Sequence, residues 1–176
     1  MQAILRQEKQ TDHKAVFDLI EKAFANEAIS DHNEQFLVER LRKTEAFVPE
    51  LSIVAEIENT IVGHILLTKL KIKNLQNEYD SLALAPVSVL PSFQNKGIGG
   101  MLIKRAHIIA KELGYQSIAL LGHANYYPRF GYHQAANFGI EFPFKAPTEN
   151  CMIIELIENS LEGVSGKIAY PKEFLG

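Results

Sequence analysis

The chain has 176 residues, a formal net charge of −3 at pH 7, and 47% hydrophobic and 22% charged residues. This length and composition predict that residues 1–176 form a single globular domain with a real core, and they exclude global disorder. The lack of a block of basic residues argues against a nucleic-acid partner. No apolar run approaches the roughly 18 residues of a membrane span. With one cysteine and no signal peptide, we expect a cytoplasmic protein.

The first half of the chain combines two helical patterns with a strand hairpin. Val16, Leu19 and Ile20 fall on one helical face, and Glu34 follows Asp31 at the spacing of a capping box. Apolar and polar residues then alternate as in half-buried strands. The predicted elements of this half are helices starting near Thr11 and Asp31, strands at 51–57 and 61–72, and a polar loop at 74–80.

The run 82–90 is almost continuously apolar, as in a strand that is buried on both faces. Pro86 lies within this run and cannot donate a main-chain hydrogen bond, which central strands normally require. One interpretation is a sheet edge or a strand end. The other is a bulge that kinks the strand and leaves the amides of Val87 and Val89 free for a ligand.

The second half predicts a strand–helix–strand unit. Apolar residues recur at spacings of 4, 3 and 4 from Leu102 to Leu113, which is typical of an amphipathic helix, and Gly114 is placed to end it. The further elements are strands at 117–121 and 151–157 and a short helix at 125–130 that ends at Gly131. Because hairpins precede this unit, we expect an α+β fold with a mixed central sheet flanked by helices.

Between the apolar run and this helix lies the segment Gln94–Gly100, with three glycines and Lys96. A helix start offers unpaired N–H groups and partial positive charge, and glycine lets a phosphate approach the main chain closely. A turn that only packs the helix on the sheet is the alternative. The segment lacks the Lys-Ser/Thr of a P-loop, and the spacing Gly97-Ile98-Gly99 followed by Leu102 differs from the dinucleotide-binding fingerprint.

The motif Gln94-x-x-Gly97-x-Gly99 resembles the acetyl-CoA motif of the GNAT superfamily of N-acetyltransferases. The resemblance extends back to 87–91, similar to the fourth strand of that family, and forward to 125–132, similar to its short helix with a Tyr-x-x-x-Gly-Tyr pattern. The tail at 166–171 resembles a bacterial subgroup of predicted acetyltransferases. The resemblance implies the GNAT fold, with a splayed sheet, over the whole chain.

The resemblance also implies a reaction, in which an amine directly attacks acetyl-CoA, the co-substrate. The acceptor would be a small-molecule or peptide amine. Main-chain groups of the kinked strand would hold the pantetheine arm and stabilise the oxyanion, and the glycine segment would wrap the pyrophosphate. The residues implied in cofactor binding are Val87, Ser88, Val89, Gln94, Asn95, Lys96, Gly97, Ile98, Gly99, Gly100 and Asn125.

Two side chains are candidates for proton transfer. Tyr127 lies four residues before Gly131, where many GNAT members keep a tyrosine that protonates the leaving thiolate; Tyr126 competes for this role. Many members place a glutamate on the fourth strand, but 81–89 contains no carboxylate. His123, after the fifth predicted strand, is the candidate base, with a structural histidine as the alternative.

Other interpretations stay open. Asn125 either contacts pantetheine or caps the short helix, and Cys151 is expected to be a small apolar side chain and not a nucleophile. The histidines show no metal-ligand spacing, so we expect no metal. The missing glutamate leaves a catalytically silent acetyl-CoA-binding module as an alternative function, and a phosphate-binding scaffold is a second one. The sequence also leaves a homodimer open.

Overall fold

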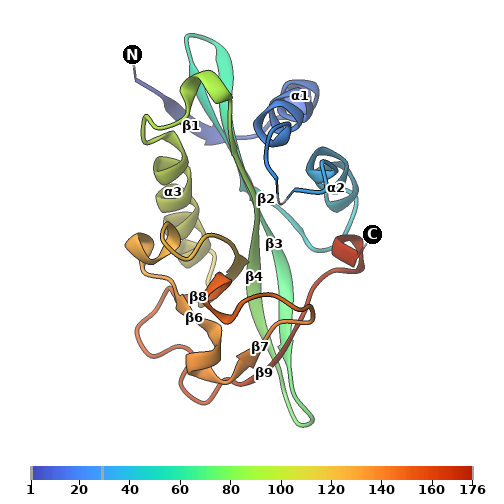
Figure 1. Ribbon diagram of the computed structural model, residues 1–176, viewed down its shortest axis with the longest axis vertical. Coiled ribbons are helices and arrows are strands. Elements are labelled where there is room, and N and C mark those ends of the chain that lie inside the picture. The colour runs from blue at the N-terminus through green and yellow to red at the C-terminus, as the bar shows by residue number, and fades with distance from the viewer. Residues whose placement is uncertain (1, 29, 176) are drawn as a thin grey trace. The chain divides into compact units, whose positions relative to one another are not determined.

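The computed structural model describes residues 2–28 and 30–175, which contain both α-helices and the strands of a mixed sheet (Figure 1). The chain divides into two units, Met1–Thr68 with Ala85–Ile109, and Lys69–Leu84 with Ala110–Gly176. Strands β3 (Thr60–Lys73) and β4 (Glu78–Val89) each contribute residues to both units.

The other elements are shorter. The helices are α1 (His13–Phe24), α2 (Glu34–Leu41) and α3 (Ile98–Glu112). The remaining strands are β1 (Ile4–Gln7), β2 (Phe47–Ile57), β5 (Ser117–Leu121), β6 (His133–Gln134), β7 (Ile140–Glu141), β8 (Cys151–Glu155) and β9 (Gly166–Ala169). Single turns of 3₁₀ helix cover Gln10–Asp12, Pro91–Phe93, Tyr127–Phe130, Ala135–Phe138, Thr148–Asn150 and Lys172–Leu175.

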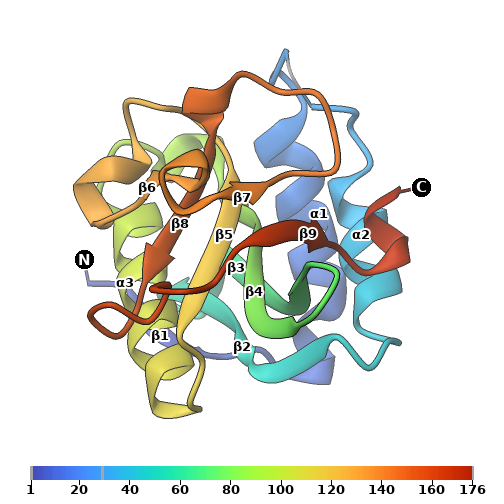
Figure 2. The same ribbon diagram turned by 90° about the horizontal axis from the view of Figure 1, so that it is seen from below.

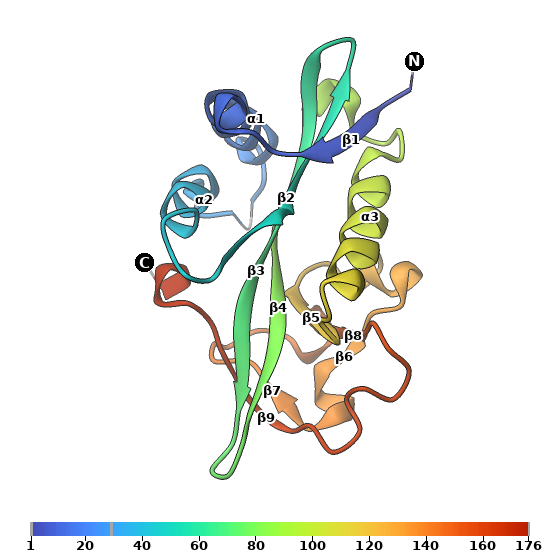
Figure 3. The ribbon, with the colours of Figure 1, turned by 180° about the vertical axis from the view of Figure 1, so that it is seen from behind.

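In the first unit, β1, β2 and β3 form an antiparallel sheet with helices on both faces. Figure 1 and the opposite view in Figure 3 agree that α1 and α2 cover one face and α3 the other. This arrangement explains why β3 is buried at every position from Val62 to Thr68. A strand that is covered on both faces needs a continuous apolar run and not an alternating one.

Gly63 lets the start of α3 pack closely against β3. A Cβ at this position would lie 3.0 Å from Leu102 Cδ1 and 3.1 Å from Ile98 Cγ2. Both distances are shorter than ordinary van der Waals contact. A larger residue at this position would therefore press on the Ile98 and Leu102 side chains of α3, whose first turn belongs to the predicted cofactor site.

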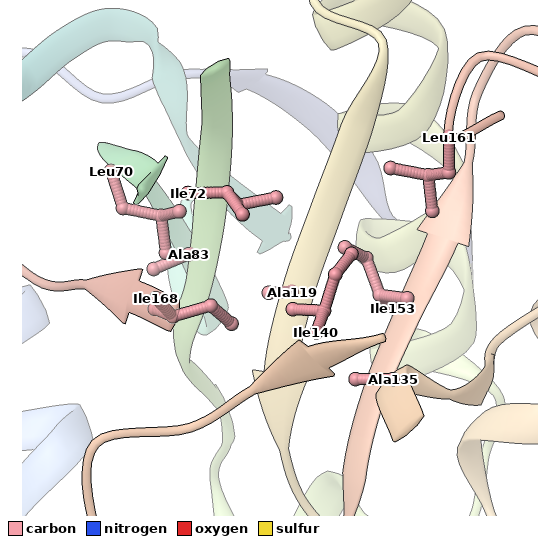
Figure 4. Packing of buried hydrophobic residues seen from close by; sticks show 9 residues of the cluster. All are labelled: Leu70, Ile72, Ala83, Ala119, Ala135, Ile140, Ile153, Leu161 and Ile168. Carbon is pink, nitrogen blue, oxygen red and sulfur yellow. The ribbon is translucent and has the colours of Figure 1, made fainter. Parts of the chain in front are cut away.

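In the second unit, β5 pairs in parallel with β4 and antiparallel with β8, while β9 joins β3 to the short strand β7 (Figure 2). Parallel and antiparallel pairs together make the sheet mixed, as predicted. The strands of this unit bring aliphatic side chains together in one cluster (Figure 4). Its buried members are Leu70, Ile72, Ala83, Ala119, Ala135, Ile140, Ile153, Leu161 and Ile168.

Two predicted helix caps are wrong, although helices begin within three residues of Thr11 and Asp31 as predicted, and local hydrogen bonds explain why. Helix α2 begins at Glu34, because the Asp31 carboxylate accepts the N–H of Asn33 at 2.9 Å and forms a turn before the helix. Thr11 does not cap α1, because it lies inside the preceding 3₁₀ turn. The Asp12 carboxylate satisfies a free N–H there by accepting from Lys9 N–H at 2.7 Å.

Strand β4 is longer than predicted, since it starts at Glu78 within the segment expected to be a loop. Strands β6, β7 and β9 were not predicted, because they are two to four residues long and carry little periodicity. Within the described ranges, no helix is both long and apolar enough to cross a bilayer.

Candidate active site

The segment that links β4 to α3 is fixed at its start by a side chain. Gln94 Nε2 donates a hydrogen bond to Val89 C=O at 3.1 Å, which ties the loop to the end of β4. Asn95 and Gly97 then adopt left-handed main-chain conformations, with φ of 62° and 83°. A Cβ at Gly97 would meet nothing within 4 Å, so the glycine serves the backbone conformation and leaves open space beside it.

Helix α3 begins directly after this turn with free main-chain donors. Its first i to i−4 bond joins Met101 N–H to Gly97 C=O at 3.0 Å. The N–H groups of Ile98, Gly99 and Gly100 therefore precede the helical hydrogen-bond ladder and have no partner within the helix. Together with the partial positive charge of the helix start, they form a site suited to phosphate.

Lys96 adds a positive charge at this junction. Its side chain is exposed, and Nζ lies 5.4 Å from the centre of the Phe93 ring. A cation over an aromatic face is held only weakly at an exposed site. The ammonium group can therefore move toward an anion at the start of α3.

The last residues of β4 turn their main-chain groups in alternating directions. Leu90 N–H donates to Val62 C=O of β3 at 2.9 Å. Because the main-chain groups of successive residues in a strand point to opposite neighbours, those of Val89 and Val87 point away from β3. The main-chain groups of these two residues are thus directed away from β3, and their binding of a ligand stays a prediction.

Pro86 lies inside β4, four residues before Leu90, and the Ala85–Pro86 peptide bond is cis. Because the strand continues to Val89, the interpretation of Pro86 as a strand end is wrong. The parallel ladder between β4 and β5 comprises only Leu82 with Ile118 and Ala83 with Ala119. The residues of β4 beyond Ala83 therefore lie outside that ladder.

In the second unit, Tyr127 is buried at the start of a 3₁₀ turn that ends at Gly131. Its ring packs edge to face with Tyr126 and Tyr132, at centroid distances of 5.1 and 5.8 Å. Burial raises the pKa of Tyr127 to about 12, so the phenol keeps its proton at neutral pH. It can therefore serve as a proton donor throughout the physiological range.

Tyr126 has a different environment from Tyr127. It is only half-buried, and the Arg129 guanidinium lies 4.7 Å from its ring centre. Arg129 Nε also donates to the main-chain carbonyl of Tyr126 at 2.9 Å. Tyr126 therefore holds the turn together, while Tyr127 presents the more desolvated phenol.

The capping interpretation of Asn125 is wrong. The cap of the 3₁₀ turn is Tyr126, no side chain bonds there, and Asn125 is exposed. His123 is also exposed, two residues beyond β5, and its carbonyl accepts the N–H of Tyr126 at 3.2 Å. Its main chain thus starts the turn, and a catalytic role for its side chain stays a prediction.

Gly122 positions Tyr127, and we expect Gly122→Ala to displace the phenol. A Cβ at residue 122 would lie 2.4 Å from Tyr127 Cε2, which no packed structure tolerates. Overpacking of this kind costs about 1–3 kcal/mol of stability, and a catalytic group moved by about 1 Å can lose up to about 100-fold in rate. Thermal unfolding and steady-state kinetics would measure both effects. An unchanged kcat would show that the position of the Tyr127 phenol does not matter for catalysis.

The first unit also contains a buried polar network that was not predicted from the sequence. The Glu8 carboxylate accepts two hydrogen bonds from Arg42, at 3.1 and 2.5 Å, and one from Ser52 Oγ at 2.9 Å. Ser52 Oγ lies 3.0 Å from Nε2 of His64, which is fully buried. The signal was a histidine inside an otherwise apolar strand pattern.

Burial lowers the pKa of His64 to about 4, and we expect this shift to make the protein acid-sensitive. The unfolded chain binds a proton near pH 6.5 and the folded chain only near pH 4, so stability is lost as the pH falls through this interval. The loss approaches about 3 kcal/mol. His107, also shifted to about 4 by burial, adds a loss in the same direction. Urea unfolding at several pH values should show that His64→Gln removes about half of the loss of stability that occurs as the pH falls. An unchanged pH dependence in this variant would contradict the assignment of that loss to His64.

Comparison with known proteins decides the family. A family model described as the acetyltransferase (GNAT) family matches residues 15–132, more than half of the chain. The chain belongs to the GNAT family of acetyltransferases. An uncharacterized N-acetyltransferase of Escherichia coli, YjhQ, is 34% identical over 148 residues, which cover 80% of this chain and 82% of YjhQ.

Solved GNAT structures share the fold. A GNAT family acetyltransferase from Brucella melitensis, in complex with acetyl-CoA, has a TM-score of 0.80 and 30% identity, with 98% of each chain covered. The GNAT protein YhbS from Escherichia coli, in complex with CoA, has a TM-score of 0.88 at 23% identity, covering 100% of this chain and 93% of YhbS. The predicted α+β GNAT fold is therefore confirmed.

Proposed function

We propose that this GNAT chain transfers the acetyl group of acetyl-CoA to a primary amine of a small-molecule or peptide acceptor, with residues 1–176 acting as one catalytic domain. The observation that carries the proposal is the junction of β4 and α3. There, unpaired N–H groups of a helix start follow a left-handed turn at Asn95 and Gly97. The acetyl-CoA complex of the Brucella melitensis protein supports the choice of co-substrate.

The residues of the first unit fit a diphosphate and a pantetheine arm. The N–H groups from Gln94 to Gly100, with Lys96 beside them, would hold the two phosphates. The main-chain groups of Val87 and Val89 point away from β3 and would pair with the pantetheine amides as an added strand does. One of these N–H groups would stabilise the oxyanion that forms on the thioester carbonyl. Asn125 would contact pantetheine through its exposed side chain.

The chemistry needs one proton donor and one proton acceptor. Tyr127 would protonate the leaving thiolate, since its phenol is neutral up to about pH 12. The acceptor must take the proton that the amine loses when its nitrogen bonds to the acetyl carbon. No carboxylate lies between Ser81 and Val89, and His123 is the candidate that the sequence offers.

A binding experiment followed by an activity screen tests this function. Acetyl-CoA and CoA at about 100 times their Kd should raise the melting temperature by roughly 5–10 °C, and ATP should not. Thiol release from acetyl-CoA would then be measured against a panel of polyamines, amino acids, aromatic amines and peptides. Stabilisation by CoA without acetyl transfer to any amine would favour a silent binding module. Stabilisation by simple phosphate, with no preference for CoA, would contradict the proposal.

A further inference from the structure

The buried network of the first unit fixes the protonation state of His64. The Glu8 carboxylate forms an ion pair with Arg42 and accepts its hydrogen bonds. Ser52 has one hydroxyl proton and donates it to Glu8 at 2.9 Å. Ser52 Oγ can then only accept from His64, so Nε2 of His64 carries the proton. The lone pair of the neutral imidazole is therefore on Nδ1.

Nδ1 of His64 has no hydrogen-bond partner among the described residues, although His64 is fully buried. Buried polar atoms without partners are uncommon and call for an explanation. Strand β4, all of which is described, contains one further atom of this kind, the hydroxyl oxygen of Ser88, a residue that is 4% exposed. The imidazole nitrogen is an acceptor, and the serine hydroxyl can donate.

The strand register puts these two groups side by side. Leu90 N–H bonds to Val62 C=O, which makes Leu90 and Val62 directly opposite residues of an antiparallel pair. From this pair we infer that Ser88, two residues back along β4, lies opposite His64 on the same face of the sheet. The register at the turn, where Asn74 N–H bonds to Asn77 C=O, differs by one residue, and we assign this shift to the part of β4 before Ser88. Directly opposite Cβ atoms are about 5 Å apart, so a χ1 rotation of Ser88 or one bridging water would connect Oγ with Nδ1 of His64.

Ser88 also lies between Val87 and Val89, whose main-chain groups we propose to hold the thioester end of acetyl-CoA. We propose, on the basis of the acetyltransferase function above, that His64 and not His123 accepts the proton of the attacking amine, through the hydroxyl of Ser88. Ser52 and Glu8 are positioning residues, because they keep the proton on Nε2 and leave Nδ1 free.

The proton transfer balances without any further reactant. As the amine nitrogen bonds to the acetyl carbon, its N–H bond breaks and the proton passes to Ser88 Oγ. The Ser88 hydroxyl proton simultaneously forms the N–H bond at His64 Nδ1. The resulting imidazolium keeps Nε2–H and is stabilised through Ser52 by the Glu8 carboxylate. After the amide leaves, Nδ1–H returns its proton through Ser88 to water.

The charges near His64 set the pH range of this step. Three charged or titratable groups lie near His64: Glu8 before α1, His13 at the start of α1, and Arg42 after α2. The negative charge of Glu8 favours the imidazolium form of His64, whereas Arg42 and a protonated His13 disfavour it. The pKa of His64 is lowered to about 4 mainly by burial, so the imidazole is neutral and able to accept a proton at neutral pH. Activity that depends on His64 should fall as the pH approaches 4.

Kinetics of His64→Gln test the proposal, with His133→Gln, at an exposed histidine of β6, as the matched control. The glutamine amide can still donate to Ser52 Oγ but cannot take up a proton. With the fastest amine of the panel, His64→Gln and Ser88→Ala should each lower kcat about 100-fold, and the double variant should lose little more. His64→Gln should keep the KM for acetyl-CoA and the fold at pH 7, and it should lose the acid limb of the pH profile. The control His133→Gln should retain its kcat.

Wild-type kcat in His64→Gln, or a loss of kcat in His123→Gln alone, would overturn the proposal. Nitrogen NMR of labelled histidine gives a second measurement that needs neither turnover nor an acceptor. We expect the neutral His64 ring to carry its proton on Nε2 and to lose this preference in Ser52→Ala. A proton on Nδ1 would overturn the role of His64 and leave the acetyltransferase function standing, whereas a wild type without acetyl transfer to any amine would refute both.

Discussion

Gly99→Glu should abolish the binding of acetyl-CoA. Gly99 is in the first turn of α3, where its N–H has no partner within the helix and would face a phosphate. A glutamate adds bulk and a negative charge at this point. Two like charges about 4 Å apart near a protein surface repel by about 4 kcal/mol, which corresponds to about 1,000-fold in affinity.

Two control variants separate the causes of this loss. Gly99→Gln adds nearly the same bulk without the charge, so the difference between the two variants measures the electrostatic part. Ile108→Glu adds the same charge at an exposed position further along α3 and should leave affinity unchanged. Calorimetric titration with acetyl-CoA at low and high salt would show the charge effect shrinking as salt increases. Unchanged affinity in Gly99→Glu would refute this cofactor site.

Much of the fold could be predicted because burial leaves a clear pattern. The strand at 117–121 is found with the predicted bounds, and α3 follows the glycines as the apolar spacing indicated. The errors concern features that depend on a single hydrogen bond. The Asx turn at Asp31 delays α2 by three residues, although Asp31 and Glu34 have the spacing of a capping box. Composition alone cannot distinguish these two local structures.

The candidate site stays a prediction, but the structure gives physical reasons for two of its motif residues. Gln94 and Gly97 follow from motif spacing, and the structure adds their physical reasons, a hydrogen bond to Val89 and a left-handed conformation. The network of Glu8, Arg42 and His64 could not be predicted, because its members come from three segments that only the folded sheet and helices bring together. Nothing in local periodicity identifies such partners.

Tyr127→Phe should slow turnover and leave the affinity for acetyl-CoA nearly intact. The change removes one oxygen and keeps the ring contacts with Tyr126 and Tyr132, so the fold should be preserved. A positioned general acid contributes about 100-fold or more to the rate, and we expect kcat to fall by this factor. Steady-state kinetics with the best amine of the panel, together with calorimetric titration of acetyl-CoA, would separate the two quantities.

Tyr126→Phe is the matched control, because it removes the same group from the neighbouring ring and should keep kcat.

The pH profile adds a test of the acid itself. With the pKa of Tyr127 at about 12, a rate that depends on its neutral phenol should show no alkaline decline from this group near pH 10, where an ordinary tyrosine ionises. If Tyr127→Phe turned over as fast as the wild type, another group would have to protonate the thiolate. If only Tyr126→Phe were slow, the proton donor would be the half-buried phenol beside Arg129, and the motif register would have selected the wrong one of two adjacent tyrosines.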